Sequence, residues 1–267
     1  YKTMFPIPLA EAASFDRDAM EKSARIAAIE TAANGVHWTF APMVDISRDP
    51  RWGRIMEGAG EDVYLGCEAA KARVKGFQGK SLADANTIAA CVKHFAAYGG
   101  AIGGRDYNAT DMSERMMQEV YLPPYKAAID AGVATVMSSF NTNGGIPASG
   151  DHWLQTELLK KQWGFKGFVV SDWTSVPEML YHGIADNAYD GAFYGMNAGV
   201  DMDMMGSYYL DHGKKLLENK KITMQQIDDM VSRILLVKFQ LGLFDNPYQY
   251  NDLKKQNELT LHPDHLA

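Results

Sequence analysis

Five short apolar runs, each separated from the next by a helix-like segment, restrict the fold of this chain more than any other feature. The runs cover residues 37–46, 88–95, 134–141, 167–173 and 198–204. They are apolar on both faces rather than alternating, which is typical of strands buried in a parallel sheet. Consecutive parallel strands are joined by helices that cover the sheet. The pattern therefore predicts an α/β fold built from βα units.

The segments between the runs carry helical spacing and helix end signals. They cover residues 16–35, 60–79, 112–132 and 149–164, and a long final helix is expected near Thr223 to Gly242. Thr223 is the expected N-cap of that helix and Gly242 its stop. The pair Pro123-Pro124 is expected to kink or split the third helix. Only residues 246–260 are interpreted as an exposed tail or linker.

Composition excludes several classes of function. Hydrophobic residues make up 46% of the 267 positions and charged residues 22%, which is typical of a soluble globular protein. No run approaches the roughly 18 consecutive apolar residues of a membrane-spanning helix. The net charge of −7 gives no electrostatic footprint for nucleic acid. The seven histidines show no metal-binding spacing, so neither a metal nor another cofactor is predicted.

The two cysteines and the first residues say little about the compartment. Cys67 and Cys91 form no CxxC motif, and two cysteines cannot build a disulfide framework. We interpret them as two small buried thiols. No secretory signal is visible at the start of the sequence.

Polar residues close each of the five runs. They are Asp45, Lys93-His94, Ser138 to Asn141, Asp172, and the pair Asp201 and Asp203. The carboxyl ends of parallel strands meet at one edge, where α/β proteins place their sites. One polar rim is therefore the predicted functional site. The acids at 201 and 203 have the wrong sign for the phosphate site of a barrel enzyme.

Asp172 stands at the end of the run "GFKGFVVSDW" and is followed by Trp173. A carboxylate there can cap the next helix, which is a common structural role for Asp. An aromatic ring beside an acid also suits a sugar, with the ring against its apolar face and the acid at the anomeric carbon. The residues alone leave both interpretations open. Glu178 is a second carboxyl by proximity only, and we expect it to point away from Asp172.

Two further motifs carry cationic side chains. Lys93 and His94 end the second run, and the loop "YGGAIGGRDYN" behind them has enough glycine to bring Arg105 over a pocket. The stretch "DISRDPRWGRIMEGAGED" has three arginines followed by three acids. We expect Arg–carboxylate forks in this loop, which leave one Arg free for ligand oxygens. Structural ion pairs, a buried core His and an exposed loop are the plain alternatives.

The motifs "GFKGFVVSDW", "KHFAAYG", "DISRDPRWGRIMEGAGEDVYL" and "FNTNGGIPAS" together resemble the N-terminal barrel domain of family-3 glycoside hydrolases, most closely the β-glucosidases and β-xylosidases. The resemblance spans nearly the whole chain. It implies a TIM-like (β/α)8 catalytic barrel over residues 1–245, with residues 246–267 as a linker. It also implies a retaining exo-β-glycosidase for terminal β-D-glucosides. A β-xylosidase or a non-catalytic sugar-binding barrel is the alternative.

The resemblance also assigns roles to individual residues. Asp172 matches the catalytic nucleophile, which forms a covalent glycosyl-enzyme intermediate. The residues that match sugar-binding positions are Arg54, Lys93, His94, Arg105, Phe140 and Trp173. Many relatives carry Tyr at the position of Phe140, so a hydroxyl contact near the nucleophile is expected to be absent. The branch that cleaves N-acetylglucosaminides is disfavoured, because this chain has "KHFAAYGGAIGG" at its distinguishing motif.

The resemblance implies parts that the sequence does not show. We expect the barrel to be incomplete at its N-terminus, where the first strand is missing. The acid/base of the family lies in a second α/β domain, which we expect to be a partner of this barrel. A partner domain or a homodimer is expected to cover the exposed edge. The parent protein is expected to be periplasmic or secreted, with a β-glucoside or oligosaccharide as its substrate.

Overall fold

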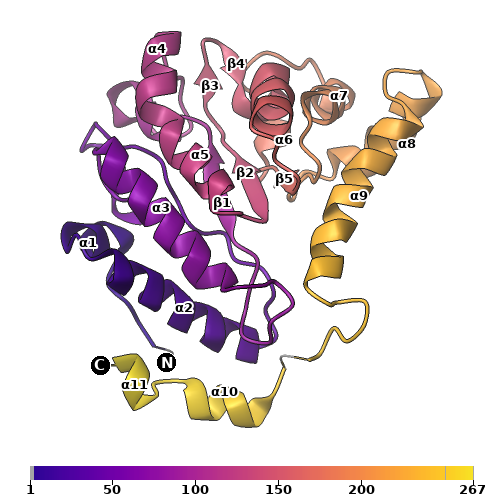
Figure 1. Cartoon of the computed structure of the whole chain (residues 1–267). Helices are drawn as coiled ribbons and strands as arrows, with labels where there is room; N and C mark the ends of the chain where they lie inside the picture. Colours follow the sequence, from indigo (N-terminus) through magenta and orange to yellow (C-terminus); the bar gives the residue numbers. More distant parts are fainter. Residues whose placement is uncertain (1–2, 250, 267) are drawn as a thin grey trace.

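The computed structural model describes residues 3–249 and 251–266, and its centre is a parallel sheet (Figure 1). The strands β1 (Cys91–Phe95), β2 (Thr135–Ser138) and β5 (Phe168–Val170) lie in the order β1-β2-β5. Both neighbouring pairs are parallel. The predicted α/β arrangement is therefore present, with three of the five expected runs as regular strands.

The first and fifth runs are not regular strands, and this corrects the prediction. Isolated parallel bridges join Trp38 to Ala89, Met43 to Lys93, and Val170 to Met202, so both runs still flank the sheet. Each flanking run pairs on one side only. In the first, Pro42 has no N–H to donate. In the fifth, the N–H groups of Asp201 and Met202 both donate to the carbonyl of Val169, which interrupts the ladder.

The third run is shorter than predicted, because its last residues leave the sheet and enter a hairpin. The antiparallel strands β3 (Thr142–Asn143) and β4 (Ile146–Pro147) form this hairpin. Its turn residues Gly144 and Gly145 both have positive φ angles, 56° and 89°. Two adjacent positive φ angles are what a two-residue hairpin turn requires, and glycine adopts them without strain.

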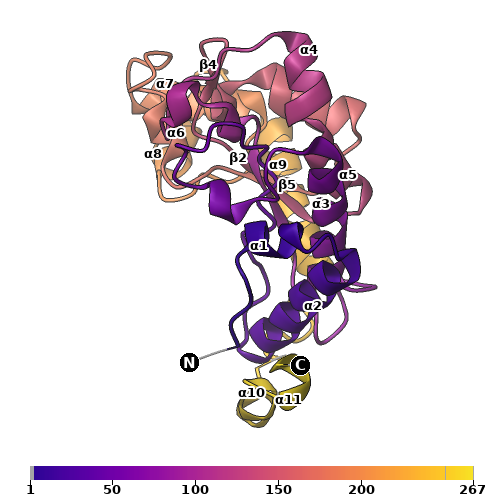
Figure 2. The same cartoon turned by 90° about the vertical axis from the view of Figure 1, so that its left-hand side faces the viewer.

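Helices surround the sheet (Figures 1 and 2). The α-helices are α1 (Pro8–Ala13), α2 (Arg17–Ala33), α3 (Val63–Gln78), α4 (Glu114–Met116), α5 (Pro123–Asp130), α6 (Ser175–Glu178), α7 (Ala188–Ala198), α8 (Tyr208–Glu218), α9 (Met224–Gln240), α10 (Leu253–Leu259) and α11 (Pro263–Leu266). The segments η4 (Met117–Tyr121) and η6 (Trp153–Gln162) are π-helical, and short 3₁₀ turns lie at η1 (Ile55–Glu57), η2 (Tyr98–Gly100), η3 (Ile102–Gly104) and η5 (Ala148–Gly150).

The helix end signals explain most of these bounds. Thr223 caps α9 through a reciprocal capping box with Gln226, and Gly242 follows the helix with a φ of 69°. The predicted break at Pro123-Pro124 is confirmed, because the two prolines open α5 directly after η4.

Part of the range 246–260, where an exposed tail or linker was expected, is helical, although most of its described residues are exposed. Asp252 caps α10, and the helix packs against α2, where Gln256 donates to Asn34. Tyr250 of the same range lies outside the described residues, as do Tyr1, Lys2 and Ala267. The proposed boundary between residues 245 and 246 stays a prediction.

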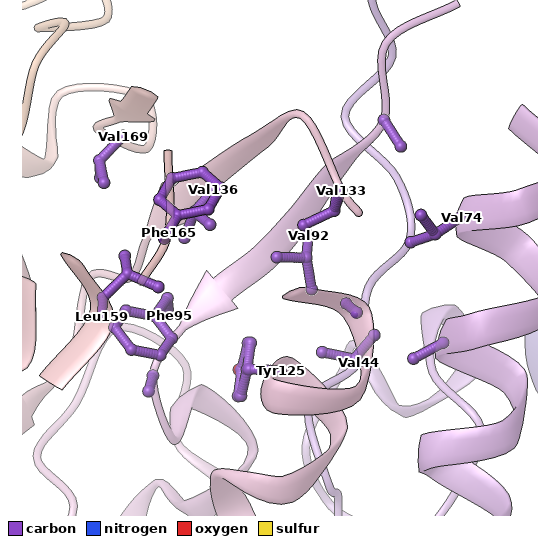
Figure 3. Close-up of a cluster of buried hydrophobic side chains, with 14 of the residues drawn as sticks. Val44, Val74, Val92, Phe95, Tyr125, Val133, Val136, Leu159, Phe165 and Val169 are labelled. Carbon is purple, nitrogen blue, oxygen red and sulfur yellow. The ribbon is translucent and has the colours of Figure 1, made fainter. Parts of the chain in front are cut away.

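The sheet buries both faces. One face packs against α2, α3, α5 and η6 (Figure 3). The buried side chains of this core include Val44, Val74, Val92, Phe95, Tyr125, Val136, Leu159 and Val169. The opposite face packs against α9 through Val237 and Leu241, which share a cluster with Cys91, Phe168 and Val170. Alternate residues of each strand therefore serve different cores, which explains why the runs are apolar on both faces.

Within the part of the chain that the structure describes, no helix has the length and apolar character needed to cross a bilayer.

Candidate active site

Asp172 follows the buried strand β5 by two residues, and its side chain is only 12% exposed. Its Oδ1 accepts a hydrogen bond from the backbone N–H of Trp173 at 2.7 Å. Its Oδ2 has no hydrogen-bond partner among the described residues. The N-cap of α6 is Thr174, so the Asp172 side chain does not cap that helix. The structural alternative considered for Asp172 therefore fails, and the carboxylate remains available for chemistry.

His94 links Asp172 to a second buried carboxylate. The Nε2 atom of His94 lies 3.5 Å from Asp172 Oδ2, and its Nδ1 atom lies 2.9 Å from Asp45 Oδ2. The same Asp45 oxygen accepts the backbone N–H of His94 at 3.0 Å. Tyr125 donates from its hydroxyl to Asp45 Oδ1. The imidazole is 1% exposed and therefore has a single fixed orientation.

Arg54, Glu57 and Lys93 form a charged group beside His94. Arg54 donates from Nε to Glu57 Oε1 at 2.6 Å and from Nη2 to Oε2 at 2.9 Å. Lys93 Nζ lies 3.5 Å from Glu57 Oε2. The predicted Arg–carboxylate fork is thus present. Burial alone would raise the pKa of Glu57, but the hydrogen bonds and charge of Arg54, helped by Lys93, lower it to about 2.

The charge of Arg54 is equally well supported. Burial lowers the pKa of Arg54, but the paired Glu57 outweighs this and leaves the pKa above its usual value. The guanidinium also lies 5.7 Å from the centre of the Tyr98 ring. The Nη1 group takes no part in the fork with Glu57, so it is available for a ligand oxygen.

Aromatic rings surround the acid. Trp173 is 56% exposed and stands directly beside Asp172. Phe140 is buried, and its ring centre lies 4.7 Å from that of Tyr107 and 5.8 Å from that of Tyr98. Burial raises the pKa of Tyr107, and nearby acids that include Asp172 raise it further. The expected absence of a hydroxyl contact at the position of Phe140 stays a prediction.

Glu178 is half-buried. Burial, together with the charge of Asp172, raises the pKa of Glu178 to about 7. The expectation that the side chain of Glu178 points away from Asp172 stays a prediction.

Arg105 does not join the group in this structure. It is exposed, and its side chain makes no hydrogen bond or ion pair with any residue that the structure describes. The loop that carries it is fastened at its end, where Thr110 donates to Asn143 Oδ1 at 2.6 Å. Asn143 and Asn141 in turn donate to the carbonyl of Ala96, which fixes the turn after β1.

Sequence reasoning missed three contributors to this site. Asp45 was recognised only as a polar strand end, and Glu57 only as one acid in a charged loop. Tyr125 carried no signal, because one Tyr in an apolar helix cannot be told from core. The spacing of Arg54 and Glu57, three residues apart, was the one pattern that could have indicated their pairing.

Residues 1–237 match the family described as "Glycosyl hydrolase family 3 N terminal domain". The chain belongs to glycosyl hydrolase family 3. A periplasmic beta-glucosidase of Salmonella typhimurium is 45% identical over 249 residues, which are 93% of this chain and 32% of that protein. A putative beta-xylosidase of Formosa agariphila is 35% identical over 92% of this chain and 33% of that protein.

Solved structures of beta-glucosidases superpose on this chain. The beta-glucosidase of Listeria innocua superposes with a TM-score of 0.97 at 44% identity, over 99% of this chain and 37% of that one. Its structure in complex with glucose superposes with a TM-score of 0.96. The family-3 chain described here thus spans about a third of the length of the relatives that it matches.

Proposed function

We propose that this family-3 domain is the catalytic domain of a retaining exo-β-glycosidase that hydrolyses terminal β-D-glucosides. The observation that carries the proposal is the buried carboxylate of Asp172 at the carboxyl edge of a parallel sheet, beside His94 and the cations of Lys93 and Arg54. In the proposed reaction an oxygen of Asp172 attacks the anomeric carbon while the bond to the leaving oxygen breaks. Water then cleaves the resulting glycosyl ester and regenerates the carboxylate.

The neighbouring side chains have distinct proposed roles. Arg54, Lys93 and His94 donate hydrogen bonds to the hydroxyls of the reacting sugar, for which their N–H groups are suited. Trp173 supplies an exposed ring for the apolar face of the sugar, and Phe140 is proposed as a further apolar part of the sugar site. Arg105 is proposed to contact the outer part of a longer substrate.

We propose a TIM-like (β/α)8 barrel as the architecture. Five parallel segments follow one another in sequence order, and α2, α3, α5 and η6 cover one face of them. In such barrels the active site lies at the carboxyl ends of the strands, where Asp172 and His94 lie here. An acid/base from a second α/β domain of the same protein completes the proposed mechanism, and a homodimer is a further proposal.

The relatives support the choice of substrate and compartment. A beta-glucosidase at 45% identity is more similar than the putative beta-xylosidase at 35%, so a β-glucoside is proposed first and a β-xyloside second. The first of these relatives is named as periplasmic, which supports an extracytoplasmic location for this protein.

The decisive experiment uses a 2-deoxy-2-fluoro-β-glucoside with an activated leaving group, because its first step needs no acid. Intact mass and peptide mapping should show one adduct, on Asp172. Asp172→Gly should abolish both the adduct and hydrolysis but retain sugar binding, whereas Glu178→Gln should keep the adduct. If the wild-type protein binds glucose but forms no adduct, a non-catalytic sugar-binding barrel is supported. An adduct on Glu178 would show that Glu178, and not Asp172, is the nucleophile.

A further inference from the structure

Asp45 is a buried carboxylate that the proposed reaction does not use, yet it accepts hydrogen bonds from two residues, His94 and Tyr125. Its side chain is fully buried. Oδ2 accepts from the backbone N–H of His94 at 3.0 Å and faces His94 Nδ1 at 2.9 Å. Oδ1 accepts from the hydroxyl of Tyr125. A carboxylate in this setting fixes its partner's orientation, because moving either group would leave a buried charge without hydrogen bonds.

The contact with Asp45 determines which imidazole nitrogen carries a proton. An ionised carboxylate can only accept hydrogen bonds, so Nδ1 of His94 must donate. Nε2 is then directed toward Asp172 Oδ2, 3.5 Å away. A ring turned over about its χ2 bond would lose the contact between Nδ1 and Asp45 Oδ2, the oxygen that also accepts the main-chain N–H of His94.

The state of Nε2 follows from its other neighbour. Asp172 Oδ2 is buried and has no hydrogen-bond partner among the described residues. A bare Nε2 would set its lone pair against this negatively charged oxygen at 3.5 Å, which is electrostatically unfavourable. A protonated Nε2 would instead supply the missing donor.

The groups around His94 include three acids and two cations. Asp45 and Asp172 lie at its two nitrogens, and Tyr98 stacks edge-on at 5.2 Å. The third acid, Glu57, is paired with the cations Arg54 and Lys93. Burial and the charge of Asp45 hold the pKa of Tyr125 well above 10, so its hydroxyl stays protonated as a donor.

We propose that Asp45 is a positioning residue that makes both ring nitrogens of His94 hydrogen-bond donors. His94 then donates from Nε2 to Asp172 in the empty site, and to a sugar hydroxyl when substrate enters. The role toward substrate rests on the proposed function, whereas the state of the ring does not.

Nitrogen-15 NMR of the histidine-labelled protein tests the state of the ring directly. Ring shifts at neutral pH, assigned with a His94→Asn variant, should show two protonated nitrogens at His94. In Asp45→Asn the amide oxygen can still accept from Nδ1, but the charge is lost, so Nε2 should lose its proton. We expect kcat/KM for an aryl β-glucoside to fall roughly 10- to 100-fold, mainly through kcat, as for loss of a charge-assisted hydrogen bond.

Matched variants separate this role from a structural one. Asp49→Asn removes an acid four residues away that pairs with Arg51, and should leave the His94 shifts unchanged. Tyr125→Phe keeps the charge of Asp45, so both nitrogens should stay protonated. A wild-type His94 with one protonated nitrogen would overturn the proposal, as would Asp45→Asn that lowers activity or melting temperature with unchanged ring shifts.

The remaining outcomes are also informative. If Asp45→Asn does not fold by circular dichroism, the wild-type and Tyr125→Phe spectra decide the question. If the wild type hydrolyses no β-glycoside, the proposed function fails while the ring shifts still support or overturn the role of Asp45.

Discussion

Replacing Glu57 by Gln should weaken the ion pairs of both Arg54 and Lys93. The Glu57 carboxylate accepts two hydrogen bonds from Arg54 and lies 3.5 Å from Lys93 Nζ. A fall in the pKa of Glu57 from 4.5 to about 2 corresponds to about 3.4 kcal/mol, at 1.36 kcal/mol for each pKa unit. The side chain is 36% exposed, so solvent screening reduces this figure. We expect Glu57→Gln to lower the free energy of unfolding by about 1–2 kcal/mol at pH 7.

The sign of the pH dependence is fixed by the direction of this shift. The pKa of Glu57 is lower in the folded state, so its contribution is present above the unfolded value of 4.5 and is lost as the pH falls toward 2. Urea unfolding, followed by tryptophan fluorescence at pH 7 and pH 3, should therefore show the difference between wild type and variant shrinking at pH 3.

Activity gives a second readout for the same change. A carboxamide can accept from Arg54 on one side only, so the guanidinium should become less ordered and KM for a β-glucoside should rise. Glu21→Gln, an exposed acid on α2, is the matched control and should change neither quantity. An equal stability difference at both pH values would refute the reasoning, because the loss would then not come from the ionised form of Glu57.

Two further predictions concern Glu178 and Gly167. The pKa of Glu178 is raised to about 7 in the folded state, so its protonated form stabilises the protein below pH 4.5, and this contribution disappears as the pH rises through 7. The melting temperature of Glu178→Gln should therefore rise relative to that of the wild type between pH 4.5 and pH 8. Parallel curves of melting temperature against pH would contradict this. A Cβ at Gly167 would lie 1.9 Å from the carbonyl of Ala134, so Gly167→Ala should destabilise the domain by at least about 1–3 kcal/mol in urea unfolding. Gly213→Ala, where the helix leaves open space, should be neutral or stabilising, and a similar loss at both positions would rule out the clash as the cause.

The α/β pattern could be predicted from the sequence because both of its determinants are local. Apolar runs with two buried faces and helices with clear caps at Asp16, Asp62 and Thr223 are visible without knowing any partner. The flanking runs were overestimated because hydrophobicity does not show whether a strand has neighbours on one side or both. Helix α10 was not predicted because it has no buried residues of its own and packs on α2.

The candidate site could be predicted only in part for a related reason. Residues in single motifs, such as Lys93-His94 and Asp172-Trp173, stand out because chemistry-bearing side chains are adjacent in sequence. The link from Tyr125 to Asp45 joins residues 80 positions apart, and spacing carries no information about such a contact. The position of Arg105 could not be predicted either, since a glycine-rich loop permits many paths.

One face of strand β1 bears both a core side chain, Cys91, and a charged side chain, Lys93. Cys91 belongs to the cluster that Val237 of α9 covers, and Lys93, two residues later, pairs with Glu57. Two residues of a strand span only about 6.6 Å. The ammonium group is therefore mounted at the end of a stiff, fully packed element rather than on a free loop. The ammonium group of Lys93 therefore needs little reorganisation when a ligand binds, because its position is fixed when the chain folds.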